Sequence, residues 1–116
     1  MSELIKVETS ELEGAALDWT VAKAAGENRV QVDALAIPIM LREGVFHPCQ
    51  FSRNWEQGGP LVEEHVTALN QSDSGGWWAH SGNHVGEALT PLIAAMRAIV
   101  ASKLGDTVEV PKELVT

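Results

Sequence analysis

The chain has 116 residues, 45% of them hydrophobic, and its 16 acidic and 8 basic side chains give a net charge of −8. This length suits one domain with its own core, which we place at residues 1–116. A surface for DNA or RNA needs an excess of Lys and Arg, so nucleic acid is not an expected partner, whereas a basic partner is compatible with the charge.

The sequence also indicates where the protein works. No run approaches the roughly 18 apolar residues that span a bilayer; the longest, residues 34–41, is short and contains Pro38. The first residues, MSELIKVETSE, carry acids where a signal peptide has basic and then apolar residues. We therefore expect a cytoplasmic protein with no membrane partner, and its single cysteine, Cys49, excludes an internal disulfide.

The first part of the chain gives one strand signal and one helix signal. Residues 4–7 predict a strand, and Ser10 stands three positions before Glu13, which is the spacing of a capping box. Apolar residues at helical spacing predict a helix over residues 11–25, ended by Gly26.

The middle of the chain predicts short strands and loops. Residues 28–33 and 34–41 favour strands, with Pro38 implying a sheet edge or a bulge, and 45–47 favour the returning strand of a hairpin. The remaining predictions are strands at 66–69 and 77–80, irregular or loop segments at 51–59, 70–76 and 81–87, and a short helical turn that begins at Pro60.

A second helix is the clearest element. Thr90 suits its cap, Pro91 its first position and Gly105 its end, and residues 108–111 predict a last strand. The order of elements predicts an α+β fold in which two main helices pack on a small, largely antiparallel sheet.

Three blocks of sequence together resemble one family. They are TSELEGAALDW with VAKA (residues 9–19 and 21–24), FS with WEQGGPLVE (51–52 and 55–63) and TPLIAAMRAIVASKLGDTVEVP (90–111). In this order they resemble the NinX-like family of small phage and prophage proteins over nearly the whole chain. The resemblance implies an accessory protein made in the bacterial cytoplasm, and it supplies no reaction. Residues 70–87 depart from the family pattern, so the histidines there look particular to this sequence.

The histidines and Cys49 raise metal binding and nucleophilic catalysis as alternatives. His47 and Cys49 with His80 and His84 would suit tetrahedral zinc, but the His-x-Cys spacing and the loop-like SGN between the last two favour surface histidines. A lone cysteine is more often a small buried apolar residue than a nucleophile. We expect no metal and no cofactor. Without a nucleophile elbow, Walker loop or dinucleotide fingerprint, the sequence leans against an enzyme.

Asp18 and Arg97 are charged residues in otherwise apolar, alanine-rich helices. A charge there needs a partner or a site. One hypothesis is that the two helices pack through their small faces and that Asp18 pairs with Arg97. The alternative is that each side chain reaches solvent on its own.

Trp55 with Gly58, Gly59 and Pro60 is the preferred candidate for a functional surface. Tryptophan is frequent at binding hot spots and is also a good core residue, so both roles are open for Trp55. Gly58-Gly59-Pro60 predicts a tight turn, with the presentation of N–H groups to an anion as the alternative.

The adjacent Trp77 and Trp78 must point to opposite faces if they lie in a strand. One of them should then be core. The other, for which we take Trp78, should be exposed or covered by residues 81–87 or by a second subunit.

The leading functional hypothesis is a non-enzymatic accessory protein that binds a host or phage protein at these residues. The runner-up is a binder of a small or nucleotide-type ligand, and potentially an enzyme, with a pocket in which Arg97 meets an anion and the tryptophans stack on a ring. A homodimer formed through an exposed apolar patch is a further expectation.

Overall fold

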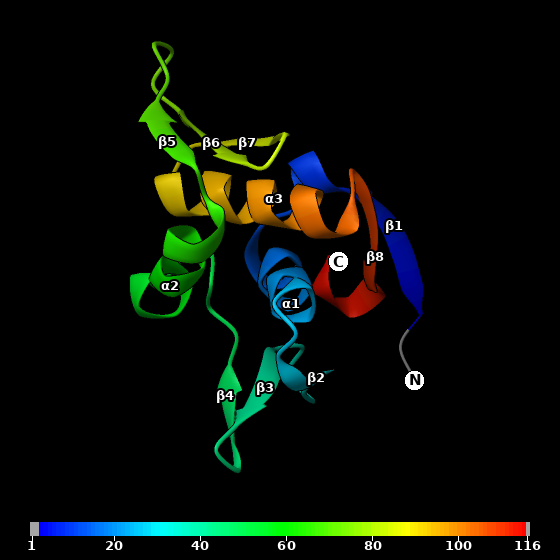
Figure 1. The fold of residues 1–116 in the computed structure, drawn as a ribbon. Coiled ribbons are helices and arrows are strands. Elements are labelled where there is room, and N and C mark those ends of the chain that lie inside the picture. Colours follow the sequence, from blue (N-terminus) through cyan, green and yellow to red (C-terminus); the bar gives the residue numbers. More distant parts are fainter. Residues whose placement is uncertain (1–2, 116) are drawn as a thin grey trace.

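A computed structural model describes residues 3–115 of the chain, and its elements are named as in Figure 1. The helices are α1 (Gly14–Ala24), α2 (Trp55–His65) and α3 (Pro91–Leu104), with short 3-10 turns η1 (Thr9–Glu11) and η2 (Lys112–Leu114). The strands are β1 (Leu4–Glu8), β2 (Asn28–Val32), β3 (Pro38–Arg42), β4 (Val45–Pro48), β5 (Ala68–Gln71), β6 (Trp77–Ser81), β7 (His84–Ala88) and β8 (Thr107–Pro111).

These strands form three antiparallel sheets within residues 3–115. Sheet A pairs β1 with β8, sheet B has the order β2-β3-β4, and sheet C has the order β5-β6-β7. The α+β class and the antiparallel pairing are confirmed. The prediction of two main helices on one sheet is wrong for this part of the chain, because α2 is a third helix and the strands are divided among separate sheets.

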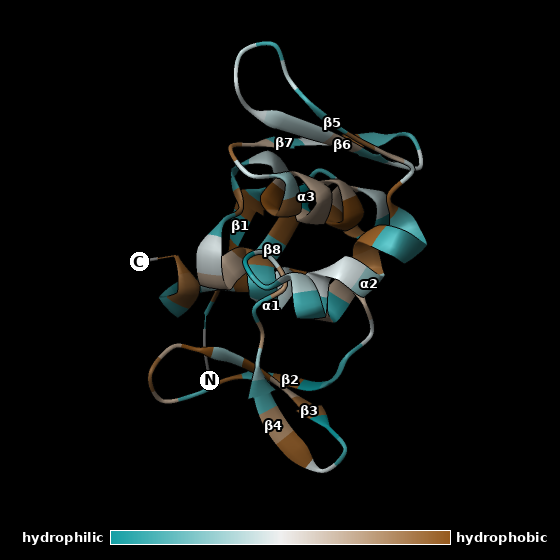
Figure 2. Ribbon diagram, turned by 90° about the vertical axis from the view of Figure 1, so that its left-hand side faces the viewer, coloured by the Kyte–Doolittle hydropathy of each residue, from teal (hydrophilic) through white to brown (hydrophobic). Residues whose placement is uncertain are grey.

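The elements are stacked in layers around α3. Sheet C lies on one side of α3, and α1 and α2 lie on the other, with sheet B beyond them and sheet A at the side (Figures 1 and 2). The core fills the space around α1 and α3, and its largest fully buried side chains include Phe51, Leu12, Leu17, Met40 and Met96.

Helix α3 forms as the sequence predicts. Thr90 caps it by accepting a hydrogen bond from Ile93 N at 3.2 Å, and Pro91 occupies its first turn, where a missing N–H costs nothing. Gly105 follows the helix with φ of 100°, a conformation that side chains disfavour.

Helix α1 differs from its prediction at the start. The predicted capping box at Ser10 and Glu13 does not form: residues 9–11 make a 3-10 turn, and α1 begins at Gly14 without a side-chain cap. Gly14 has φ of 57°, a left-handed conformation that interrupts the chain between the 3-10 turn η1 and helix α1.

The hairpin of β3 and β4 is confirmed. Glu43 and Gly44 connect the strands with φ of 52° and 79°, the two positive values of a tight turn that matches the twist of paired strands. Pro38 is the first residue of β3, where proline costs no ladder hydrogen bond.

Two loop predictions are right only in part. Residues 51–54 are irregular, but α2 begins at Trp55, and residues 82–83 form a turn, but residues 84–87 belong to β7, which pairs with β6. In both segments, glycines favour a loop prediction although they lie inside regular elements. Gly58 and Gly86 leave room for another part of the chain, and Gly59 precedes a proline.

No helix within the described residues is long and apolar enough to cross a membrane.

Candidate functional site

Trp55 opens α2 and remains in contact with solvent. Asn54 caps the helix by accepting a hydrogen bond from Glu56 N at 2.8 Å, which satisfies one of the free N–H groups of the first turn. Trp55 itself is 50% exposed. Of its two expected roles, the structure therefore gives it a surface position.

Gly58 is the buried residue of α2, one turn after Trp55. A Cβ atom at this position would collide with the backbone oxygen of Phe51 and with the side chain of Leu92 in α3. The N–H of Gly58 donates to Asn54 O at 2.9 Å, so it serves the helix and is not presented to an anion. Gly58 thus sets how closely α2 packs on its neighbours.

Gly59 and Pro60 continue the helix and do not form the predicted turn. A residue before proline is disfavoured in a helix partly because its Cβ clashes with the proline ring, and Gly59 has no Cβ. The position where that atom would lie is 3.9 Å from Trp55 Cε3, so the indole lies beside this glycine. Pro60 is exposed.

Asp18 is fully buried in α1 and is bound to the segment that leads into α2. Its Oδ1 accepts a hydrogen bond from Ser52 N at 2.7 Å, and Arg53 Nε lies 4.0 Å from its Oδ2. Among the described residues, Oδ2 has no hydrogen-bond partner. Burial raises the pKa of the Asp18 carboxyl above its usual range, and Ser52 and Arg53 oppose this rise.

Arg97 is half-buried in α3 and is held by backbone carbonyls. Its Nε donates to Leu12 O at 2.8 Å and its Nη1 donates to Glu87 O at 2.7 Å. Burial lowers the pKa of the guanidinium, with Glu13 opposing. The predicted Asp18–Arg97 pair is wrong, because Asp18 faces the segment before α2 while Arg97 bridges η1 and β7.

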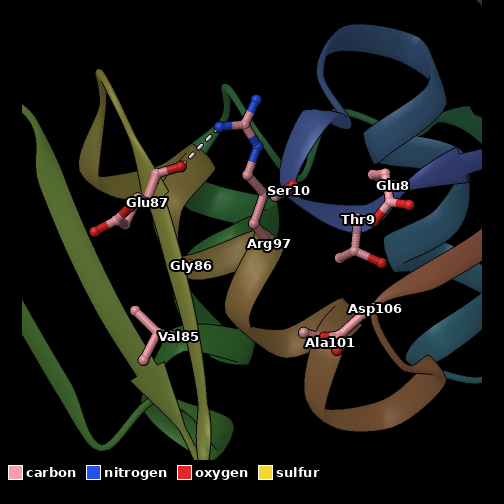
Figure 3. Close-up of a pocket in the computed structure, with 9 residues that line it drawn as sticks. All are labelled: Glu8, Thr9, Ser10, Val85, Gly86, Glu87, Arg97, Ala101 and Asp106. Atoms are coloured by element: carbon pink, nitrogen blue, oxygen red, sulfur yellow. Dashed lines mark hydrogen bonds between the residues drawn. The ribbon is translucent and has the colours of Figure 1, made fainter.

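A pocket of about 570 Å³ lies beside Arg97, between η1, α3 and β7 (Figure 3). Its lining residues are Glu8, Thr9, Ser10, Val85, Gly86, Glu87, Arg97, Ala101 and Asp106. A pocket thus lies beside Arg97 and apart from Asp18, but Trp55, Gly58 and Gly59 are not among the residues that line it. No tryptophan lines it, so the stacking of a ring between tryptophans is not available there.

Trp77 and Trp78 point to opposite faces of sheet C, as predicted. Trp77 is partly buried against the core, whereas Trp78 lies on the outer face, opposite Asn70 and Glu87, with its ring 4.9 Å from that of His80. Helix α2 lies on the other side of α3 from sheet C (Figure 1). Trp55 and Trp78 thus belong to two surfaces and not to one site.

Comparison with known families finds a match over most of the chain. A family model described as bacteriophage P22 NinX matches residues 8–103, which include every candidate site residue. The chain belongs to this phage NinX family. A comparison with curated proteins finds no match.

The four soft ligands of this NinX-family chain do not come together. Cys49 is fully buried just after β4, His47 is exposed on β4, and His80 and His84 lie in sheet C, beyond α3. No group of three or more His, Cys, Asp or Glu side chains within residues 3–115 is placed to hold a metal ion. Burial raises the pKa of the Cys49 thiol to about 12, so it is not a thiolate at neutral pH.

Sequence reasoning missed two sets of residues. Ser52 and Arg53 hold the Asp18 carboxylate, and the signal for them was the FS pair in the second family-like block. The exposed apolar side chains of sheet B were also overlooked, although the alternation of Pro38, Ile39, Met40 and Leu41 offers an apolar residue to both faces of a strand.

Proposed function

We propose that this NinX-family protein is a non-enzymatic phage accessory protein that binds a host or phage protein through α2, with Trp55 as the central contact. The observation that carries the proposal is that the indole of Trp55 is half-exposed on α2, a helix that packs closely on Phe51 and Leu92 at Gly58. A large side chain held in place loses little conformational entropy on binding, which is why tryptophan is frequent at hot spots.

The surroundings of Trp55 indicate the charge of the partner. Glu56, Glu63 and Glu64 are exposed on the same helix. Exposed acidic residues on the helix that carries Trp55 favour a partner with basic side chains, because complementary charges guide the encounter and reject acidic competitors. The net charge of −8 acts in the same direction.

Affinity capture from phage-infected host cells tests the proposal. Trp55→Ala should lose a partner that the wild type retains, since removal of a hot-spot tryptophan weakens binding about tenfold or more. Circular dichroism should show an unchanged fold, because Trp55 is outside the core. Trp78→Ala, a tryptophan-to-alanine change on the other surface, is the matched control and should keep the partner. Retention of every partner by Trp55→Ala would reject the α2 site, and dependence on Trp78 would move it to sheet C.

The pocket beside Arg97 supports a second candidate, a binder of a small ligand. The guanidinium is half-buried and bound to two carbonyls, and no carboxylate of the described residues lies within 4.0 Å of it, so an anion would offer it a charged partner. Glu8 and Asp106 also line the pocket and oppose a highly charged nucleotide. A singly charged carboxylate ligand fits this lining better. A thermal shift with small carboxylates that Arg97→Gln abolishes would favour this candidate, and equal shifts in both proteins would exclude it.

A further inference from the structure

Sheet B projects from the layered body as an arm (Figure 1) and carries exposed apolar side chains. Leu35 is 79% exposed, Val45 56% and Phe46 43%, and Ile37 is exposed as well. Apolar ribbon at β4 and at the loop between β2 and β3 is visible in Figure 2. Large apolar residues gathered on one exposed arm are typical of an interaction surface.

The two faces of sheet B have different environments. Pro38 and Met40 point inward and are buried, with α1 against β3. Ile39 and Leu41 alternate with them and therefore point to the outer face, where neither is part of the core. On the neighbouring strand, Phe46 lies opposite Leu41 and Pro48 lies opposite Ile39.

These four residues form the apolar outer face of sheet B, namely Ile39, Leu41, Phe46 and Pro48. The free edge of β4 is less suited to a partner. The strand has only four residues, and Pro48 lacks the N–H that an added strand would require. A partner should therefore pack on the face of the sheet and not extend its ladder.

Charge indicates which partner fits this face. Arg29 and Arg42 balance Asp33 and Glu43, so residues 28–48 carry no net charge with His47 neutral, and the net charge of −8 lies outside the arm. A basic protein would be attracted to the remainder of the surface. A second copy of this acidic chain meets the least repulsion if it approaches through the neutral arm.

We propose that the outer face of sheet B is a homodimer interface, in which two copies pack their apolar faces against each other about a two-fold axis. Such an interface is self-complementary, so the same residues from both copies meet, with Phe46 and Leu41 near its centre. This surface is independent of Trp55, which leaves α2 free for the partner of the proposed function.

Sedimentation velocity over a concentration series tests the proposal. The wild type should form a dimer, and Phe46→Glu should weaken the dimer about tenfold or more because two carboxylates would meet in an apolar contact. Val85→Glu is the matched control: Val85 is 51% exposed in sheet C, and this variant should dimerise as the wild type does. A wild type that is monomeric at every concentration, or a dimer that Phe46→Glu leaves unchanged, would overturn the proposal.

A cysteine cross-link locates the interface. Cys49 is fully buried, so a cysteine introduced by Phe46→Cys would be the accessible thiol. Oxidation should convert Phe46→Cys to a covalent dimer and leave Val85→Cys monomeric. Cross-linking of both variants to the same extent would indicate random collision and contradict the interface.

The two proposals fail separately. Trp55→Ala should still dimerise and lose its captured partner, whereas Phe46→Glu should be monomeric. If the wild type is monomeric and needs Phe46 to capture a host protein, the outer face of sheet B binds that protein instead of a second copy. This result would overturn the homodimer proposal.

Discussion

Sheets B and C have the same architecture, three short antiparallel strands in sequential order, but they are held to the body differently. Sheet C lies directly on α3, because Gly86 brings the backbone of β7 against Ala94 and Ala98. Sheet B meets the body through inward-facing side chains, Met40 and Pro38 of β3 and Val30 of β2, and otherwise projects outward. A sheet can thus be attached by close backbone contact over small residues or by a few inward-facing side chains. The second arrangement leaves more apolar surface free for a partner.

The largest expected effect is at the backbone contact of sheet C. In Gly86→Val, the new side chain would collide with Ala94 O and Ala98 N, so β7 must move away from α3. We expect a loss of about 4 kcal/mol in the free energy of unfolding, more than is typical of an overpacked site, because the collisions are with backbone atoms. Chemical denaturation measures it. Val85→Thr, a change at the exposed neighbouring residue, is the control and should cost far less, while equal costs would refute the backbone-contact account.

The attachment of sheet B should be the next most sensitive site. Met40→Ala removes a fully buried side chain and should lower the free energy of unfolding by about 3 kcal/mol through lost burial and a cavity. The matched change Leu41→Ala, one residue along β3 on the outer face, should cost little at concentrations where the protein is monomeric. A similar loss from both substitutions would mean that both faces of sheet B are packed within one chain.

The two regions also differ in what their sequences revealed. The strands β2 and β4 and the turn at Glu43-Gly44 were predictable, because alternation and turn residues act locally. The strand predicted over residues 34–41 was right only from Pro38 onward, since residues 34–37 form the connection between β2 and β3. The helix at Gly58 and the strand at Gly86 could not be predicted in this way. Each glycine is required by a close contact with a residue further along the chain, Leu92 for Gly58 and Ala98 for Gly86. The surface position of Trp55 and the partners of Asp18 likewise depend on how α2 packs, which local patterns do not encode.

A smaller effect concerns the link between sheet B and α2, where Asp18 binds Ser52. Because burial raises the pKa of Asp18 in the folded protein, the native state holds this proton more tightly than the unfolded chain does. The contribution of Asp18 to stability should therefore fall as the pH rises above its usual value of 3.8 and through the raised pKa.

The difference in unfolding free energy between the wild type and Asp18→Asn, measured across this pH range, isolates that contribution, since the other carboxyls titrate in both proteins. The stability of the wild type should decline relative to the variant as the pH rises. A difference that stays constant with pH would show that Ser52 and Arg53 cancel the effect of burial, and a change in the opposite direction would show that they outweigh it.

The smallest expected effect is the ion pair at the base of sheet B. Arg42 at the end of β3 donates to both carboxylate oxygens of Glu27, with Nε 3.1 Å from Oε1. The guanidinium is 42% exposed, so water and salt screen the pair, and a double-mutant cycle with Arg42→Gln and Glu27→Gln should give a coupling of about 0.5 kcal/mol. Raising the salt concentration should reduce it further. A coupling as large as the cost of Met40→Ala would mean that charge, and not the buried methionine, holds sheet B to the body.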